Sequence, residues 1–201
     1  GSIVYINAMK TTILGIGNSL LRDEGVGVHV LKALRASLPE NDSLSFVDGG
    51  TLSFTLAAEI EQTDRLIVID AAQLHEPPGT VRCFVDAEMD AFLGSCKRSV
   101  HEVGLLDLFD IARLTRTLPR QRALIGIQPA SVDWGEEPTE AVAAASEAAF
   151  TEAYQIADKQ DRYARLDAIR AATSEQLVSD AEGGYSAEEV RGAMEKLEKR
   201  V

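Results

Sequence analysis

Three carboxylates that could take part in metal binding or catalysis each follow an apolar run of this 201-residue chain. Glu24 lies in the glycine-rich turn after "TTILGIG", Asp48 ends "LSFVD", and Asp70 ends "RLIVID". If the runs are parallel strands, their carboxyl ends meet at one edge of a sheet, which is where such sheets bind ligands. Carboxylates gathered at one edge repel one another unless a cation or a basic group offsets the repulsion.

A histidine can complete this group. His101, in "SVHEVGLLD", follows a loop at the start of an expected helix, so its imidazole could reach the same edge. Two carboxylates and one imidazole suit a divalent transition metal such as nickel or zinc with open coordination positions. We therefore expect Glu24, Asp70 and His101 to form a three-ligand site. Taken singly, each acid is more often a helix cap or a loop residue, so the prediction depends on the fold.

The glycine-rich turn does not predict a phosphate site. Gly15 and Gly17 match the first two glycines of the dinucleotide fingerprint, but Leu20 stands at the third position. The Gly-Lys-Ser/Thr end of a P-loop is also absent, and nearby carboxylates would repel an anion. The glycines are expected to shape the loop, with Asp23 as the N-cap of the helix that follows.

The remaining reactive side chains carry weaker signals. His29 lies within a helical pattern and His75 within a loop, and no function is expected for either. Cys83 and Cys96 lack a metal-ligand spacing and are expected to be reduced, structural thiols. No serine sits in a nucleophile elbow, so a Ser/His/Asp triad is not supported.

The elements that must position these residues alternate between strand and helix. Apolar runs predict strands, and apolar residues at helical spacing predict helices between them. This alternation favours an α/β fold with a mostly parallel sheet and helices on both faces. Strands are expected at residues 11–17, 44–48, 65–72, 80–85 and 122–128, and helices at residues 25–38, 52–62, 101–118 and 138–159.

The chain is expected to contain one α/β domain at residues 11–159. Residues 1–10 are interpreted as a cloning remnant and the start of the natural chain, and residues 160–201 as a C-terminal helical extension broken at Gly183 and Gly184. The formal net charge of −12 argues against nucleic acid and anionic membranes as partners. No apolar run is long enough for a transmembrane helix, and no signal peptide is recognised, so a cytoplasmic location is expected.

Taken in order, these motifs resemble those of the hydrogenase maturation proteases. The resemblance covers about residues 11–159. It is carried by "GIGNSLLRDEGVGVHVLKAL", "DGGT", "LIVIDAA", "PPGTV", "SVHEVGLLDLF" and "LIGIQP". It implies a five-stranded twisted sheet and an endopeptidase that removes the C-terminal extension of a nickel–iron hydrogenase large-subunit precursor after metal insertion.

The resemblance also implies roles for the site residues. The nickel-recognition positions of the family fall on Glu24, Asp70 and His101, and the acid of its "DGGT" motif falls on Asp48. Nickel would be supplied by the substrate, with no tightly bound metal in the resting protein. Either Asp70 or Asp48 could then act as general base toward water. Two alternatives stay open, namely a non-catalytic metal-binding chaperone for hydrogenase assembly and an unrelated small hydrolase on a similar fold.

Overall fold

The computed structural model describes residues 9–38, 40–51, 54–95 and 100–157, with the backbone alone at residues 54 and 100–103. Met9–Tyr154 form one compact unit, and the fold and site below belong to it. The expected helices at residues 160–201, and most of the expected cloning remnant, lie outside the described residues. No helix in the described ranges has the length and apolar character needed to cross a membrane.

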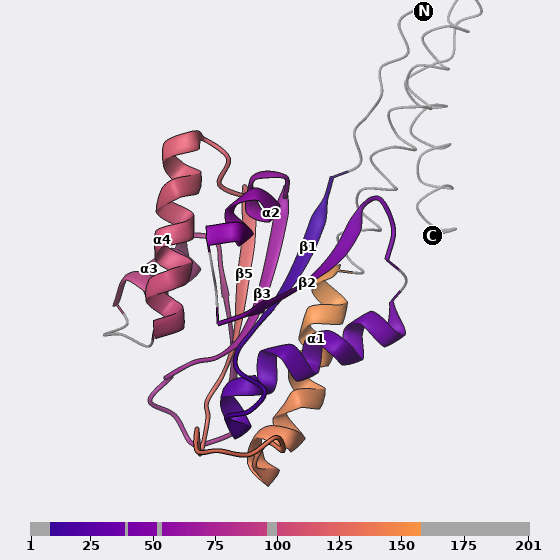
Figure 1. The fold of residues 1–201 in the computed structure, drawn as a ribbon, viewed down its shortest axis with the longest axis vertical. Coiled ribbons are helices and arrows are strands. Elements are labelled where there is room, and N and C mark those ends of the chain that lie inside the picture. The colour runs from indigo at the N-terminus through magenta and orange to yellow at the C-terminus, as the bar shows by residue number, and fades with distance from the viewer. Residues whose placement is uncertain (1–8, 39, 52–53, 96–99, 158–201) are drawn as a thin grey trace, which may run out of the picture. The chain divides into compact units, whose positions relative to one another are not determined.

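A five-stranded sheet forms the centre of this unit (Figure 1). The strand order is β2-β1-β3-β5-β4, in which only β4 is antiparallel to its neighbour. The predicted mostly parallel sheet is therefore confirmed, and the strand expected at residues 80–85 is its antiparallel edge strand. The strands are β1 (Thr11–Ile16), β2 (Leu44–Gly50), β3 (Arg65–Ala71), β4 (Val81–Val85) and β5 (Gln121–Ile127).

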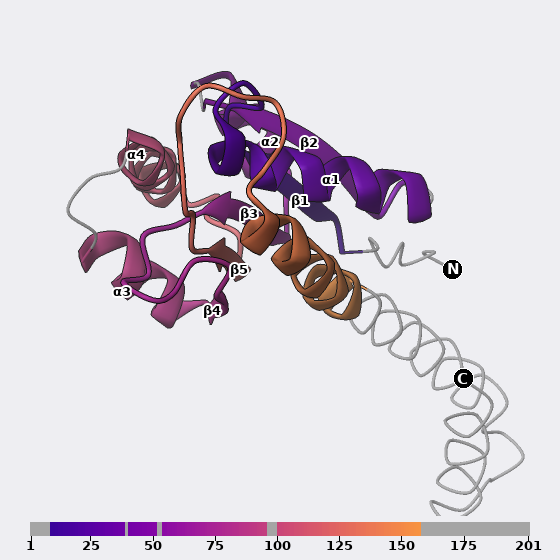
Figure 2. The ribbon, with the colours of Figure 1, turned by 90° about the horizontal axis from the view of Figure 1, so that it is seen from below.

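Helices cover both faces of the sheet, which explains why β1 is buried along its whole length. On one face lie α1 (Val26–Ser37) and, within this unit, residues 140–154 of the last described helix (residues 140–157), as Figures 1 and 2 show. On the other face, α2 (Ala57–Glu61), α3 (Ala87–Ser95) and α4 (Val100–Thr115) pack against one apolar cluster. That cluster includes Leu14, Val68, Leu105, Phe109 and Leu124. Two short 3-10 helices, η1 (Arg22–Gly25) and η2 (Phe54–Leu56), complete the described elements.

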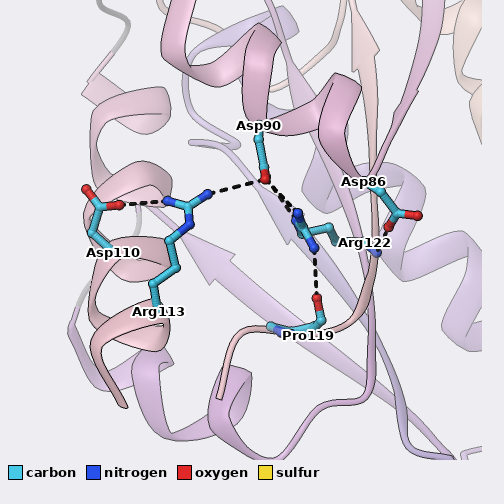
Figure 3. Close-up of polar contacts among 6 residues, drawn as sticks. All are labelled: Asp86, Asp90, Asp110, Arg113, Pro119 and Arg122. Carbon is cyan, nitrogen blue, oxygen red and sulfur yellow. Dashed lines mark hydrogen bonds and ion pairs between the residues drawn. The ribbon is translucent and has the colours of Figure 1, made fainter. Parts of the chain in front are cut away.

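Helix α3 was not predicted from the sequence. It is short, and it buries only Met89 and Leu93, so its apolar pattern is weak. A polar network attaches it to its neighbours: Asp90 of α3 accepts hydrogen bonds from Nε (2.9 Å) and Nη2 (2.6 Å) of Arg122 on β5. Arg113 of α4 forms an ion pair with the same carboxylate at 3.4 Å (Figure 3). The network thus joins α3, α4 and β5 on one side of the sheet.

Candidate active site

The predicted meeting of strand ends at one edge is confirmed for the carboxylates. Strands β2, β1 and β3 are parallel neighbours, so their carboxyl ends lie together. Glu24 lies in η1, which follows β1 after a five-residue connection, while Asp48 and Asp70 lie near the carboxyl ends of β2 and β3. The structure thus brings all three acids to the same end of the sheet.

The register separates Asp48 from Asp70. Gly15 of β1 is paired with both Asp48 of β2 and Ile69 of β3, so these residues face the same side of the sheet. A Cβ at Gly15 would meet Leu31, so this side is the one covered by α1. Asp70, one residue beyond Ile69, faces the opposite side, toward the α4 layer.

The two aspartates also differ in their surroundings. Asp48 is exposed, and its Oδ1 accepts a hydrogen bond from the backbone N–H of Gly50 at 3.0 Å, which shapes the local turn. Asp70 is only 4% exposed, and its Oδ1 atom is buried. The structure therefore encloses Asp70 and leaves Asp48 at the surface. The catalytic roles of both remain predictions.

Glu24 resembles Asp70 in that one carboxylate oxygen is shielded from solvent. Its Oε2 atom is buried, although the residue as a whole is half-buried. Glu24 and Asp70 thus each have one shielded carboxylate oxygen at the same sheet edge, and carboxylate oxygen is a ligand that divalent cations accept.

His101 lies in the first turn of α4, and its side chain is outside the described residues. The helix has 16 residues, or about 24 Å, close to the length of the seven-residue strand β5. Because α4 leads into β5, which is parallel to β3, the first turn of α4 lies toward the carboxyl ends of the strands. This is the edge that carries Glu24 and Asp70.

The three-ligand site itself stays a prediction. Among the side chains that the structure describes, no group of three or more His, Cys, Asp or Glu is placed to hold a metal ion. The imidazole of His101 is not among those side chains.

Asp23 does not cap α1, so the N-cap prediction was wrong. The N-cap residue of α1 is Gly25, without a side-chain cap, whereas Asp23 is a fully buried residue of η1. Its carboxylate accepts hydrogen bonds from the backbone N–H groups of Ala130 (2.8 Å) and Ser131 (3.0 Å). It also accepts two from Thr139. Donors from a distant loop thus replace those of the adjacent helix.

These donors decide the ionisation of Asp23. Burial by itself raises the pKa of the carboxyl, but the hydrogen bonds from Ser131, Thr139 and Ala130 outweigh it and bring the pKa below its usual 3.8. Asp23 is therefore a carboxylate at neutral pH. It attaches the loop that carries Glu24 to the segment between β5 and the last described helix.

Two glycines let this loop approach the sheet closely. Gly17 has φ of +136°, and a Cβ there would overlap the carbonyl oxygen of Glu24. A Cβ at Gly27 would overlap the carbonyl oxygens of Ile16 and Ile69, so the first turn of α1 lies directly on two strand ends. The expectation that the glycines shape the loop agrees with this packing.

The weaker candidates lie elsewhere in the fold. His29 is in α1, and its Nε2 atom is buried with no hydrogen-bond partner among the described residues. His75 is exposed in the loop after β3. Burial, followed by the charges of Glu152 and Glu88, raises the pKa of the Cys83 thiol to about 11. Such a thiol is a poor nucleophile, which fits a structural role. Cys96 lies outside the described residues.

Comparison with known proteins identifies the family. A family model described as hydrogenase maturation protease matches residues 28–156. The chain is 34% identical over 189 residues to the hydrogenase expression/formation protein HoxM of Azotobacter vinelandii, covering 92% of this chain and 91% of that protein. It is 34% identical to the hydrogenase 2 maturation protease of Escherichia coli, over 62% of this chain and 76% of that protein.

A second family model, the RNA-binding domain of polyribonucleotide nucleotidyltransferase, matches residues 138–201. This is less than half of the chain, and most of it lies outside the described residues. The match therefore assigns no second family, and the expected lack of a nucleic-acid partner remains a prediction.

The fold agrees with the sequence comparison. The hydrogenase-maturating endopeptidase HybD of Escherichia coli is similar in structure, with a TM-score of 0.71 and 32% identity over 75% of this chain and 93% of that one. The matching model, the relatives and the shared fold agree with one another, and this chain belongs to the hydrogenase maturation protease family of endopeptidases.

Proposed function

We propose that this endopeptidase removes the C-terminal extension of a nickel–iron hydrogenase large-subunit precursor after nickel has been inserted. The nickel belongs to the substrate, and the protease recognises it through Glu24, Asp70 and His101. The observation that carries this proposal is the placement of Glu24 and Asp70 at one sheet edge, each with a buried carboxylate oxygen. The backbone of the first turn of α4 approaches the same edge.

Two roles are open to these residues, recognition and proton transfer. Ligands that add to an ion already held by the precursor would place the scissile peptide beside the sheet edge, so that precursor without nickel is not positioned. In hydrolysis, the oxygen of water bonds to the carbonyl carbon, the C–N bond breaks, and the departing nitrogen takes a proton.

Asp70 is the better candidate for the base that accepts the water proton. It faces the α4 side of the sheet, whereas the register directs Asp48 to the α1 side. The Asp48 carboxylate is also engaged by the backbone N–H of Gly50. Exchange of each residue for its amide therefore separates the two: Asp70→Asn should stop cleavage, while Asp48→Asn should retain most of it.

Incubation of purified protein with nickel-loaded and nickel-free precursor, followed by intact-mass measurement, tests the proposal. We expect loss of a C-terminal peptide from loaded precursor only. Binding of the precursor without any change in mass would support a chaperone instead. Cleavage of both forms at equal rates would support a hydrolase that ignores nickel.

A further inference from the structure

Two loops at the proposed active-site edge form one hydrogen-bonded unit. The backbone N–H of Gly135 donates to the carbonyl of Leu20 at 2.9 Å, and that of Arg22 donates to the carbonyl of Gly135 at 2.7 Å. The N–H of Asp23 donates to Ser131 at 3.2 Å. Residues 18–24, after β1, are thereby joined to residues 130–139, after β5.

This unit presents large apolar side chains to solvent. Trp134 is 78% exposed, Val132 53% and Leu20 47%. The parallel bridge between Leu21 and Gly135 brings the backbone of Leu20 next to that of Trp134. The other exposed large apolar residues of the described chain, Val85, Leu114 and Tyr154, lie on three separate elements. We call Leu20, Val132 and Trp134 the docking surface.

The docking surface is fixed relative to Glu24. The N–H of Glu24 donates to the carbonyl of Leu21 at 3.0 Å, within the same short helical turn. The buried Asp23 carboxylate holds the opposite loop through Ala130, Ser131 and Thr139. A protein that covers Trp134 is therefore positioned beside the proposed nickel-recognition residues.

The charges around the docking surface indicate what it binds. Residues 18–24 and 130–139 contain five carboxylates, Asp23, Glu24, Asp133, Glu136 and Glu137, and a single cation, Arg22. Asp133, Glu136 and Glu137 are exposed. A partner that presents apolar side chains flanked by lysine or arginine would match this surface in both polarity and charge.

We propose that Leu20, Val132 and Trp134 bind an apolar surface of the hydrogenase large-subunit precursor that is flanked by lysine or arginine. This contact supplies affinity for the precursor in addition to that of the metal contacts. The inference rests on the proposed function. Trp is enriched among residues that dominate binding energy, and this one is both exposed and part of a hydrogen-bonded loop pair. Docking at Trp134 supplies general affinity for the precursor, while Glu24 and Asp70 recognise its nickel and act at the scissile peptide.

Kinetics with the full-length chain and nickel-loaded precursor test this directly. Trp134→Ala should raise KM about tenfold or more, with a much smaller change in kcat and the same thermal midpoint. Leu114→Ala is the matched control, because Leu114 is 85% exposed but lies on α4 away from these loops. Its KM should equal that of wild type. An unchanged KM for Trp134→Ala would overturn the inference while leaving the proposed function intact.

Fluorescence supplies a readout that does not depend on cleavage. Trp134 is the only tryptophan of the chain. Its fluorescence in the complex is obtained by subtracting the emission of Trp134→Phe mixed with precursor from that of wild type mixed with precursor. Precursor binding should shift its emission to shorter wavelength and reduce quenching by acrylamide. Binding that leaves quenching unchanged contradicts the inference. A shift that depends on the concentration of this chain alone also contradicts it, because a second copy would then cover Trp134.

The two experiments keep the proposals apart. If wild type fails to cleave loaded precursor, the proposed function is wrong. If wild type cleaves normally but KM or quenching fails to respond at Trp134, only the docking surface is wrong.

Discussion

Thr139 donates two hydrogen bonds to the carboxylate of Asp23, one from its backbone N–H (2.6 Å) and one from its Oγ1 (2.8 Å), although the residues are 116 positions apart. With Ala130 and Ser131, four donors converge on one buried carboxylate. The contact joins the loop that carries Glu24 to the loop that carries Trp134. The proposed recognition residue and the proposed docking surface therefore share one anchor.

Removing this anchor should destabilise the protein. Asp23→Ala leaves four part-buried donors without their acceptor, which should lower the free energy of unfolding by roughly 2–4 kcal/mol. Urea unfolding at neutral pH measures the change. Asp107→Ala, at an exposed position of α4, should stay within about 0.5 kcal/mol of wild type. Equal urea midpoints for Asp23→Ala and Asp107→Ala would show that the hydrogen bonds to Asp23 do not stabilise the fold.

Acid should weaken the fold through two identified carboxyls. Hydrogen bonds from Arg122 hold the pKa of Asp90 below its usual 3.8, and backbone donors do the same for Asp23 against the effect of burial. The unfolded chain therefore binds more protons than the folded chain near pH 4 and below. The free energy of unfolding should fall as pH drops through that range and change little above about pH 5.

Unfolding curves across this pH range check the acid dependence. In Asp23→Asn and Asp90→Asn the loss between neutral and acid pH should be smaller than in wild type, because one of the two carboxyls no longer titrates. If the free energy of unfolding falls with pH as steeply in both variants as in wild type, Asp23 and Asp90 are not the groups responsible.

Gly17 should not tolerate a side chain. Its φ of +136° disfavours other residues, and a Cβ would overlap the carbonyl oxygen of Glu24, so Gly17→Ala should cost roughly 2 kcal/mol or more and impair cleavage. Gly94 offers a matched control, because it lies in α3 with open space where its Cβ would be. Gly94→Ala should be neutral or stabilising by up to about 1 kcal/mol. If both variants behave alike, the loop does not need this close approach.

Substitutions at the site and in the core should have opposite signatures. Glu24→Gln and Asp70→Asn keep side-chain size, so they should abolish cleavage of nickel-loaded precursor with a thermal midpoint close to that of wild type. Leu66→Ala or Ile69→Ala should instead cost about 2–5 kcal/mol through a cavity in the sheet. Calorimetry and intact-mass assays on the same samples distinguish them. A large fall in midpoint for both amide variants would make these two acids structural.

Much of the fold follows from the sequence, because buried parallel strands appear as continuous apolar runs. The segment "RLIVIDA" corresponds to β3, and "TTILGI" to β1. The short helix α3 was missed because only two of its side chains are buried. The direction of β4 could not be settled locally, since it depends on pairing with β5, which comes two helices later.

The site is predictable only in part, for a related reason. Strand ends indicate which acids share an edge, but not which face each one occupies. The separation of Asp48 from Asp70 needs the pairing of both strands with Gly15. Likewise, Asp23 looks like a helix cap from its neighbours, while its actual partners lie in a loop more than a hundred residues away. The start of the last described helix, with Thr139 before Glu140, was the only signal of that partner.

The central claim is that Glu24, Asp70 and His101 contact one divalent ion. A crystal structure of this protein grown with nickel or a similar ion, with the metal located by anomalous scattering, tests it most directly. We predict one ion within about 2–2.3 Å of an oxygen of each carboxylate and a nitrogen of the imidazole. An ion bound elsewhere, or an imidazole of His101 directed away from the two carboxylates, would contradict it.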